Sequence, residues 1–92
     1  MPLTQSQFEH DHKVREQALL LLTQGYNVAA RVEGWFIEPE PILGYTPDIV
    51  AKKEDQLLIV EVKKGPIDWP KIVALQRFAE EHPEYKLYII EL

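Results

Sequence analysis

The feature that most constrains the fold of this chain is a pair of apolar stretches separated by a short polar turn. Residues 47–53 and 56–63 are rich in Ile, Val and Leu, and Glu54-Asp55 lies between them. Aliphatic and β-branched runs of this length, bounded by turn-forming residues, are typical of β-strands. We therefore predict a hairpin. Its second strand is unusual because the apolar run LLIV continues into the charged segment EVK, where a core strand would add another aliphatic residue.

The register of this hairpin decides where its charged side chains lie. Side chains alternate between the two faces of a strand, so Glu61 and Lys63 share one face. A two-residue turn at Glu54-Asp55 places Asp48 directly opposite Glu61; a four-residue turn gives the same register, and a three-residue turn shifts it by one. Carboxylates in directly opposite positions repel each other and destabilise a sheet. Lys63, a shared proton or a divalent cation would each offset that repulsion.

Of these alternatives, a divalent cation is the one that would give the site a catalytic role. Hard cations such as Mg²⁺ take oxygen ligands, typically one or two carboxylates with water and phosphate oxygens. A lysine beside them can stabilise charge on phosphate or orient an attacking water. The competing interpretation is a surface ion pair between Glu61 and Lys63 at a fraying strand end. Glu-x-Lys alone carries little information, because residues 84–86 repeat it, but the facing Asp48 favours a phosphodiester-hydrolysing site.

The N-terminal half predicts a helix, a strand and a loop. Residues 5–24 carry apolar side chains at helical spacing, and the tetrapeptide SQFE is typical of a capping box in which Ser6 and Glu9 pair reciprocally. Residues 26–33 are rich in β-formers and predict a strand. Residues 34–46 contain several Gly and Pro, and we expect a loop with room for a short strand near its start.

The C-terminal third predicts a helix and a last strand. Asp68 is placed to cap a helix that begins at Trp69 and stops at His82, because a proline follows. Residues 86–92 form the final strand. The order α-β-β-β-α-β includes a crossover that brings the last strand parallel to the third. We therefore expect one α/β domain over residues 1–92, with a central mixed four-stranded sheet flanked by helices.

Composition places the chain among soluble globular proteins. Apolar residues make up 46% and charged residues 27% of its 92 residues, as in an ordinary folded domain. The absence of cysteine excludes disulfides and thiolate metal sites and favours an intracellular location. The longest apolar run, residues 18–22, is too short to cross a bilayer, and the first residues do not resemble a signal peptide. We expect a cytoplasmic protein with no membrane partner.

The acidic net charge restricts how the chain could bind nucleic acid. Its formal charge is −5, whereas proteins that rely on non-specific phosphate contacts are usually basic overall. Any nucleic-acid surface must therefore be local. The lysines available for it are Lys52, Lys53, Lys63, Lys64 and Lys71. The alternative is that they are solvated lysines beside the acids.

These residues together resemble the signature of the PD-(D/E)xK nuclease superfamily. Pro47-Asp48 is followed thirteen residues later by Glu61, and Val62-Lys63 completes the motif. The expected order of elements is also similar to the minimal restriction-endonuclease-like core, so the resemblance covers nearly the whole chain. Within the superfamily the chain looks most like a small Holliday-junction-resolvase-like member.

The resemblance implies a metal-dependent enzyme that acts on DNA. By it, Asp48, Glu61 and the carbonyl of Val62 would bind Mg²⁺ or Mn²⁺, and Lys63 would assist the attacking water. The implied activity is that of a magnesium-dependent endodeoxyribonuclease. A chain of 92 residues would cover few base pairs, and we therefore expect a homodimer that presents two sites.

Members of the superfamily often add a polar ligand from the first helix. Extending the apolar face of that helix back by one turn reaches His10 and Asp11, which are the candidates, with solvated polar groups as the alternative. The candidate substrate-binding residues are Lys52, Lys64 and Lys71.

Two functions of other classes stay open at this point. A non-catalytic binding or regulatory subunit with a nuclease-like fold agrees with the acidic net charge and the lack of extra specificity elements. A small acidic protein-interaction module requires the facing carboxylates to be coincidental.

Overall fold

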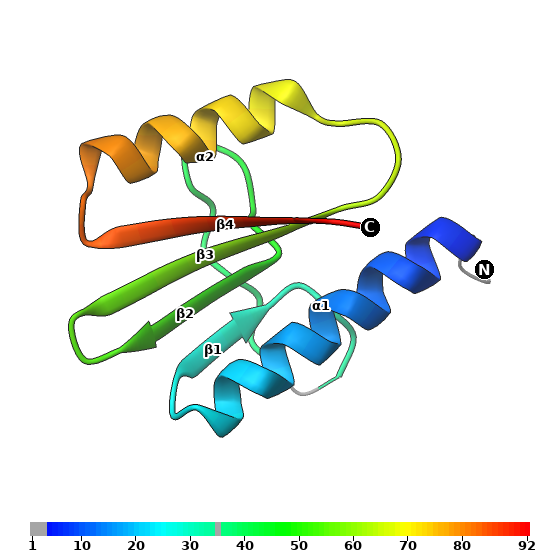
Figure 1. The fold of residues 1–92 in the computed structure, drawn as a ribbon, viewed down its shortest axis with the longest axis horizontal. Coiled ribbons are helices and arrows are strands. Elements are labelled where there is room, and N and C mark those ends of the chain that lie inside the picture. The colour runs from blue at the N-terminus through cyan, green and yellow to red at the C-terminus, as the bar shows by residue number, and fades with distance from the viewer. Residues whose placement is uncertain (1–3, 35) are drawn as a thin grey trace.

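The computed structural model describes residues 4–34 and 36–92 and has the predicted order of elements, α-β-β-β-α-β. A central four-stranded sheet has one helix along each side (Figure 1). The elements are α1 Gln5–Thr23, β1 Asn27–Ala30, β2 Ile49–Lys53, β3 Gln56–Lys63, α2 Trp69–Glu81 and β4 Tyr85–Glu91. The expected α/β class with a mixed four-stranded sheet is confirmed.

The strands lie in the order β1-β2-β3-β4. The first three are antiparallel, and β4 is parallel to β3 because the chain returns through α2. Helix α1 packs on β1, β2 and β3, where it buries Val14, Ala18 and Leu21. Helix α2 lies beside β4 and buries Ile72 and Leu75. The apolar core therefore fills the spaces between the sheet and each helix.

The β2–β3 hairpin has the register expected from the sequence. Its turn has two residues, since Lys53 lies opposite Gln56. The first residue of the turn, Glu54, has a positive φ of 55°, as tight hairpin turns require. The ladder runs without a bulge to the pair of Ile49 and Val60. Asp48 and Glu61 come next beyond that pair. Their carboxylates therefore meet at the end of the hairpin remote from the turn.

Helix α1 begins at Gln5, as the sequence predicts, but its N-terminal cap differs from the expectation. Thr4, not Ser6, is the N-cap: its hydroxyl accepts from the Gln7 amide at 3.1 Å, and the Gln7 side chain accepts from the Thr4 amide at 3.0 Å. The predicted capping box of Ser6 and Glu9 is therefore wrong. The capping pattern occurs twice in succession in the sequence, and the helix uses the earlier copy. Glu9 is left available for a different contact.

Strand β1 is shorter than the predicted 26–33 and ends at Ala30. Beyond that point the chain turns away from the sheet, and the Arg31 amide donates to the Asp48 carbonyl at 2.8 Å. This bond ties the end of β1 to the residue that precedes β2. It fixes the main chain of Asp48 before its side chain makes any contact.

The loop that follows β1 covers the outer edge of that strand. The Ala30 amide donates to the Ile37 carbonyl at 2.9 Å, in an isolated parallel bridge. The short strand expected near the start of the loop is reduced to this bridge among the described residues, and Trp35 lies outside them. At Ala30 the β1 edge of the sheet is thereby paired with this loop.

Helix α2 begins and ends as the sequence predicts. The Asp68 carboxylate accepts from the Lys71 amide at 3.3 Å, and the helix stops at Glu81 with His82 as C-cap, before the proline. Strand β4 starts at Tyr85, one residue earlier than expected. Over residues 4–34 and 36–92, no helix is both long and apolar enough to span a membrane.

Candidate functional site

Two carboxylates are buried where the hairpin ends. Asp48, just before β2, is 4% exposed, and Glu61, near the end of β3, is 1% exposed. Within the part of the chain that the structure describes, they are the charged residues of an otherwise apolar interior. Removing an ionised carboxylate from water costs several kcal/mol unless hydrogen bonds or counter-charges replace the solvent. The contacts around these two side chains must therefore account for their burial.

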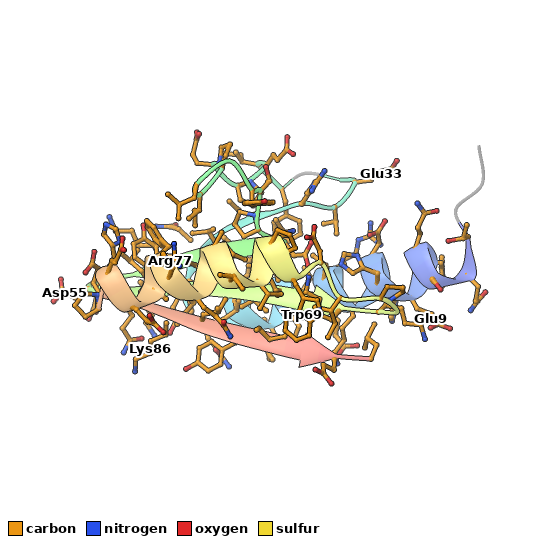
Figure 2. The ribbon with its side chains drawn as sticks, turned by 90° about the horizontal axis from the view of Figure 1, so that it is seen from above. Glu9, Glu33, Asp55, Trp69, Arg77 and Lys86 are labelled. Carbon is orange, nitrogen blue, oxygen red and sulfur yellow. The ribbon has the colours of Figure 1, made fainter. Side chains whose placement is uncertain are left out.

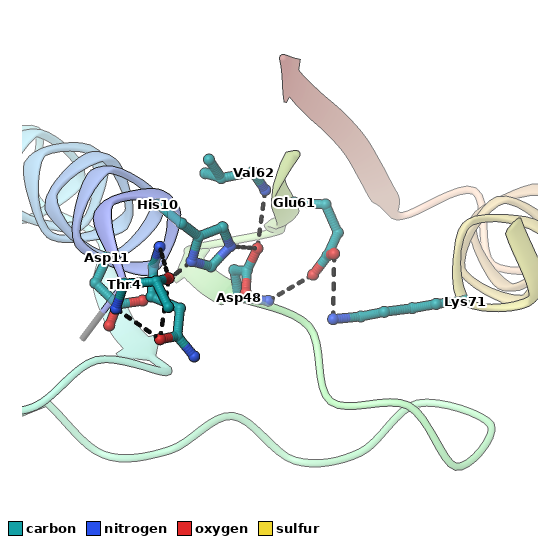
Figure 3. Close-up of polar contacts among 8 residues, drawn as sticks. Thr4, His10, Asp11, Asp48, Glu61, Val62 and Lys71 are labelled. Atoms are coloured by element: carbon teal, nitrogen blue, oxygen red, sulfur yellow. Dashed lines mark hydrogen bonds and ion pairs between the residues drawn. The ribbon is translucent and has the colours of Figure 1, made fainter. Parts of the chain in front are cut away.

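Each carboxylate accepts a hydrogen bond from the main chain of the neighbouring strand. Glu61 Oε1 accepts from the Asp48 amide at 2.7 Å, and Asp48 Oδ2 accepts from the Val62 amide at 2.9 Å (Figure 3). This reciprocal arrangement fixes both side chains, since neither can rotate without leaving a buried amide unpaired. Among the described residues, no buried polar side-chain atom lacks a partner.

Two lysines share the second oxygen of Glu61. Lys71 Nζ, from α2, lies 3.2 Å from Oε2, and Lys63 Nζ, from β3, lies 3.5 Å from it. Both lysine side chains are largely buried, at 13% and 11% exposed. Burial raises the pKa of Glu61 and the charge of Asp48 raises it further, while Lys71 opposes the shift without reversing it. Burial therefore disfavours the ionised form of Glu61, even with two cations beside it.

Helix α1 brings a histidine to the other carboxylate. His10 Nε2 lies 3.2 Å from Asp48 Oδ2, and its Nδ1 lies 3.0 Å from Asp11 Oδ1 (Figure 3). Burial lowers the pKa of His10, but the hydrogen bond with Asp11 and the charge of Asp48 outweigh it, so the net shift is upward. The first-helix candidates named from the sequence thus lie at the site, with His10 in contact and Asp11 behind it.

A second contact from α1 was not foreseen. Glu9 pairs with Lys64 at 2.6 Å, and the hydrogen bond from Lys64 lowers the pKa of Glu9. Because Glu9 was expected to cap the helix, its contact with Lys64 was not predicted. It joins the first turns of α1 to the residue that follows β3. No sequence pattern predicts it, because the two residues are far apart along the chain.

The site opens onto a hollow of about 190 Å³. Of the predicted substrate-binding lysines, Lys64 and Lys71 line it. Lys52 lies opposite Leu57, toward the turn end of the hairpin, and is exposed. The hollow is lined by His10, Asp48, Glu61, Val62, Lys63, Lys64, Pro66, Asp68 and Lys71. It is therefore polar and accessible from solvent while its two carboxylates are buried.

The donor set suits a hard divalent cation. The oxygens of Asp48 and Glu61 come from neighbouring strands, and Mg²⁺ and Mn²⁺ prefer such ligands. A divalent cation would favour the ionised form of Glu61, which burial and the neighbouring Asp48 disfavour. Across residues 4–34 and 36–92, no three His, Cys, Asp or Glu side chains are grouped as metal ligands. The acidic ligands available are therefore the two carboxylates, with the main chain of Val62 beside them.

The structure gathers most of the predicted site residues and adds one role. Asp48, Glu61 and Lys63 come together as the register implies, and Lys71 reaches Glu61 itself, a contact that the sequence does not reveal. In comparison with known proteins, no family model matches the chain, and neither a curated protein nor a solved structure matches it.

Proposed function

We propose that this protein is a metal-dependent endonuclease that hydrolyses phosphodiester bonds in DNA. The observation that carries the proposal is the pair of buried carboxylates, Asp48 and Glu61, with two lysines against the second. Packing alone does not favour them, since hydrophobic residues of similar volume are often at least as stable in such positions. A functional requirement for clustered charge explains why they are there.

The residues that would hold a divalent cation are Asp48, Glu61 and the carbonyl of Val62. When bound, Mg²⁺ or Mn²⁺ supplies Lewis acidity to the phosphate and makes water a stronger nucleophile at neutral pH. The main-chain hydrogen bonds to both carboxylates fix their orientation beforehand. His10 also fixes the orientation of Asp48, because its Nε2 holds Asp48 Oδ2 in place.

The two lysines would act on the phosphate and on the attacking water. Lys63 Nζ lies beside Glu61 Oε2 and lines the hollow, from which its N–H groups can donate to a water or to a phosphate oxygen. Lys71 approaches the same oxygen from α2 and lines the same hollow. Fixed cations at this position stabilise the negative charge that develops on phosphate during displacement. Lys64, at the rim, and Lys52, on the same hairpin, would contact flanking phosphates.

The experiment is a cleavage panel with Mg²⁺ or Mn²⁺ over branched, linear duplex and single-stranded DNA. We expect cleavage of at least one DNA form, and loss of cleavage in Asp48→Ala and Lys63→Ala. Lys86→Ala is the matched control, because it removes the lysine of the second Glu-x-Lys segment, which is exposed on β4. Cleavage that persists in both site variants, or its absence on every substrate, contradicts the proposal.

A specific observation favours a second candidate, a non-catalytic binding or regulatory subunit. The carboxylates already have partners from the chain itself: Asp48 has His10, and Glu61 has Lys63 and Lys71. Calorimetric titration with Mn²⁺ separates the two candidates. Binding that is lost in Asp48→Ala supports the nuclease, whereas no carboxylate-dependent binding supports the second candidate.

A further inference from the structure

The two edges of the sheet differ in how they are protected. The β1 edge is four residues long and is covered in part by the bridge to Ile37. Strand β4, at the opposite edge, runs for seven residues from Tyr85 to Glu91 and has no strand on its outer side within the described part of the chain. Natural proteins protect such edges with proline, bulges or charged side chains. Strand β4 has no proline, and its charged residues, Lys86 and Glu91, lie near its ends.

The main chain of β4 has hydrogen-bonding groups directed outward. The Leu92 amide donates to the Lys63 carbonyl at 2.9 Å, so the even-numbered residues at this end of the parallel ladder direct their amides to β3. The alternate residues, Leu87, Ile89 and Glu91, therefore direct amide and carbonyl groups away from the sheet. These groups are placed to continue the sheet with another strand.

Large apolar side chains flank this edge on both faces. On the α2 face, Ile89 is 38% exposed, and Trp69 and Val73 of α2 are 63% and 47% exposed. Trp69 lies on the β4 side of α2 (Figure 2). On the α1 face, Tyr88 is 50% exposed beside a hollow of about 680 Å³ between α1 and β4, which Leu20 also lines. Apolar surface on both sides of an unpaired strand marks a site of association.

We propose that β4 pairs antiparallel with β4 of a second copy of this chain, about a two-fold axis at Tyr88, and forms a continuous eight-stranded sheet. Side chains alternate along a strand, and so do the amides that point outward. Two residues that pair across the interface must therefore both have odd numbers or both have even numbers. This register satisfies that condition. Leu87 then faces Ile89 of the second copy on one side of the sheet, and the two Tyr88 rings meet on the other.

The strand is complementary to itself, which favours a second copy as the occupant. In this register Lys86 lies opposite Ile90 and Tyr85 lies opposite Glu91, so no like charges meet. The two-fold axis also brings the two α2 helices side by side on the same face. Their exposed apolar residues, Trp69 and Val73, are then available to fill the space between them. An isologous interface requires self-complementarity of this kind.

The dimer does not depend on the proposed nuclease function, but it would position the two candidate sites. Because the axis is perpendicular to the sheet, both sites lie on the α2 face. Glu61 pairs with Ile89, one residue from the axis. Strand spacing and rise then place the two Glu61 positions about 16 Å apart along the sheet.

The register is tested by a single cysteine at the axis, since the chain contains none. Directly opposite residues in a non-hydrogen-bonded antiparallel pair have Cα atoms about 4.5 Å apart, which a disulfide spans. We expect Tyr88→Cys to cross-link under mild oxidation at least about tenfold faster than Thr23→Cys, an exposed control on α1. Equal rates for the two variants overturn the proposal.

Association itself is measured by sedimentation equilibrium of the full chain. We expect the unmodified protein to show twice the 10.7 kDa chain mass, and Tyr88→Lys, which opposes two ammonium groups at the axis, to dimerise about tenfold more weakly. Leu43→Lys, at a 60% exposed position in the loop, is the control and should dimerise normally. A monomer at all concentrations, or a dimer that tolerates Tyr88→Lys, overturns the proposal. Neither readout involves metal or DNA, so a failed cleavage panel leaves this test intact.

Discussion

The two ends of the β2–β3 hairpin carry the same kinds of residue in opposite environments. At the turn end, Glu54 and Asp55 are exposed and solvated. At the other end, Asp48 and Glu61 are almost completely buried. The β-ladder continues from one end toward the other without a bulge, so the strands alone do not account for the difference.

The helices account for it. Helix α1 brings His10 to Asp48, and α2 brings Lys71 to Glu61, so both helices contact the same end of the hairpin (Figure 3). The buried end therefore has its charges held by side chains from α1, β3 and α2, while charges at the turn end are held by water. Charges that are fixed and desolvated interact strongly, whereas solvated charges are screened. The comparison predicts that equivalent substitutions at the two ends have different effects.

The largest difference is expected between Asp48→Ala and Asp55→Ala. Loss of Asp48 removes a proposed metal ligand and leaves the Val62 amide without its acceptor, which should abolish cleavage and lower the free energy of unfolding by about 1–2 kcal/mol. Asp55→Ala should retain cleavage and change stability by less than about 0.5 kcal/mol. Urea unfolding and the cleavage assay measure both. Similar stability losses at the two ends would show that burial does not distinguish them.

Glu61→Gln should separate function from stability. Because the pKa of Glu61 is raised in the folded protein, its ionisation disfavours folding progressively as pH rises from the unfolded pKa through the folded one. Glutamine keeps an acceptor for the Asp48 amide without the charge. In EDTA, we expect the free energy of unfolding of the unmodified protein to fall relative to that of the variant as pH rises from acidic to neutral, because only the carboxyl ionises. The same variant should lose Mn²⁺ binding; a stability difference between the two proteins that does not change with pH would contradict this account.

Lys71→Ala should have a smaller effect than loss of a carboxylate. Lys71 acts beside Glu61 rather than as a proposed ligand, and removal of such supporting groups typically costs about 10–100-fold in activity or metal affinity. Lys53→Ala is a suitable control at the turn end, where the lysine donates to the Gln24 carbonyl. Single-turnover cleavage rates compare the two. Equal rates for Lys71→Ala and the unmodified protein would show that Lys71 takes no part in cleavage.

The smallest effect is expected at the turn itself. Glu54 has a positive φ of 55°, a conformation that glycine adopts at lower cost. Glu54→Gly should therefore raise stability by about 0.5–1 kcal/mol, less the added flexibility of the unfolded chain, and leave cleavage unchanged. Thermal unfolding with the cleavage assay checks both. A loss of cleavage in this variant would mean that the turn controls the remote site.

Much of the site was predictable because the hairpin register is a local property. The apolar pattern and an even-length turn fix which residues face each other, so the meeting of Asp48 and Glu61 follows from the sequence. The N-cap of α1 was assigned two residues too late, because two overlapping capping patterns compete and the sequence does not rank them. The Glu9–Lys64 and His10–Asp48 contacts depend on how α1 lies on the sheet.

The sequence by itself determined the order of elements, the hairpin register and the face shared by the carboxylates and Lys63, since these depend on periodicity and turn length over short distances. Only the tertiary structure decided that Lys71 would reach Glu61, and that a loop would bridge the β1 edge while β4 has no outer partner among the described residues. Those outcomes depend on the packing of helices and loops against the sheet. Such packing is set by the shape of the whole core, which no short stretch of the chain specifies.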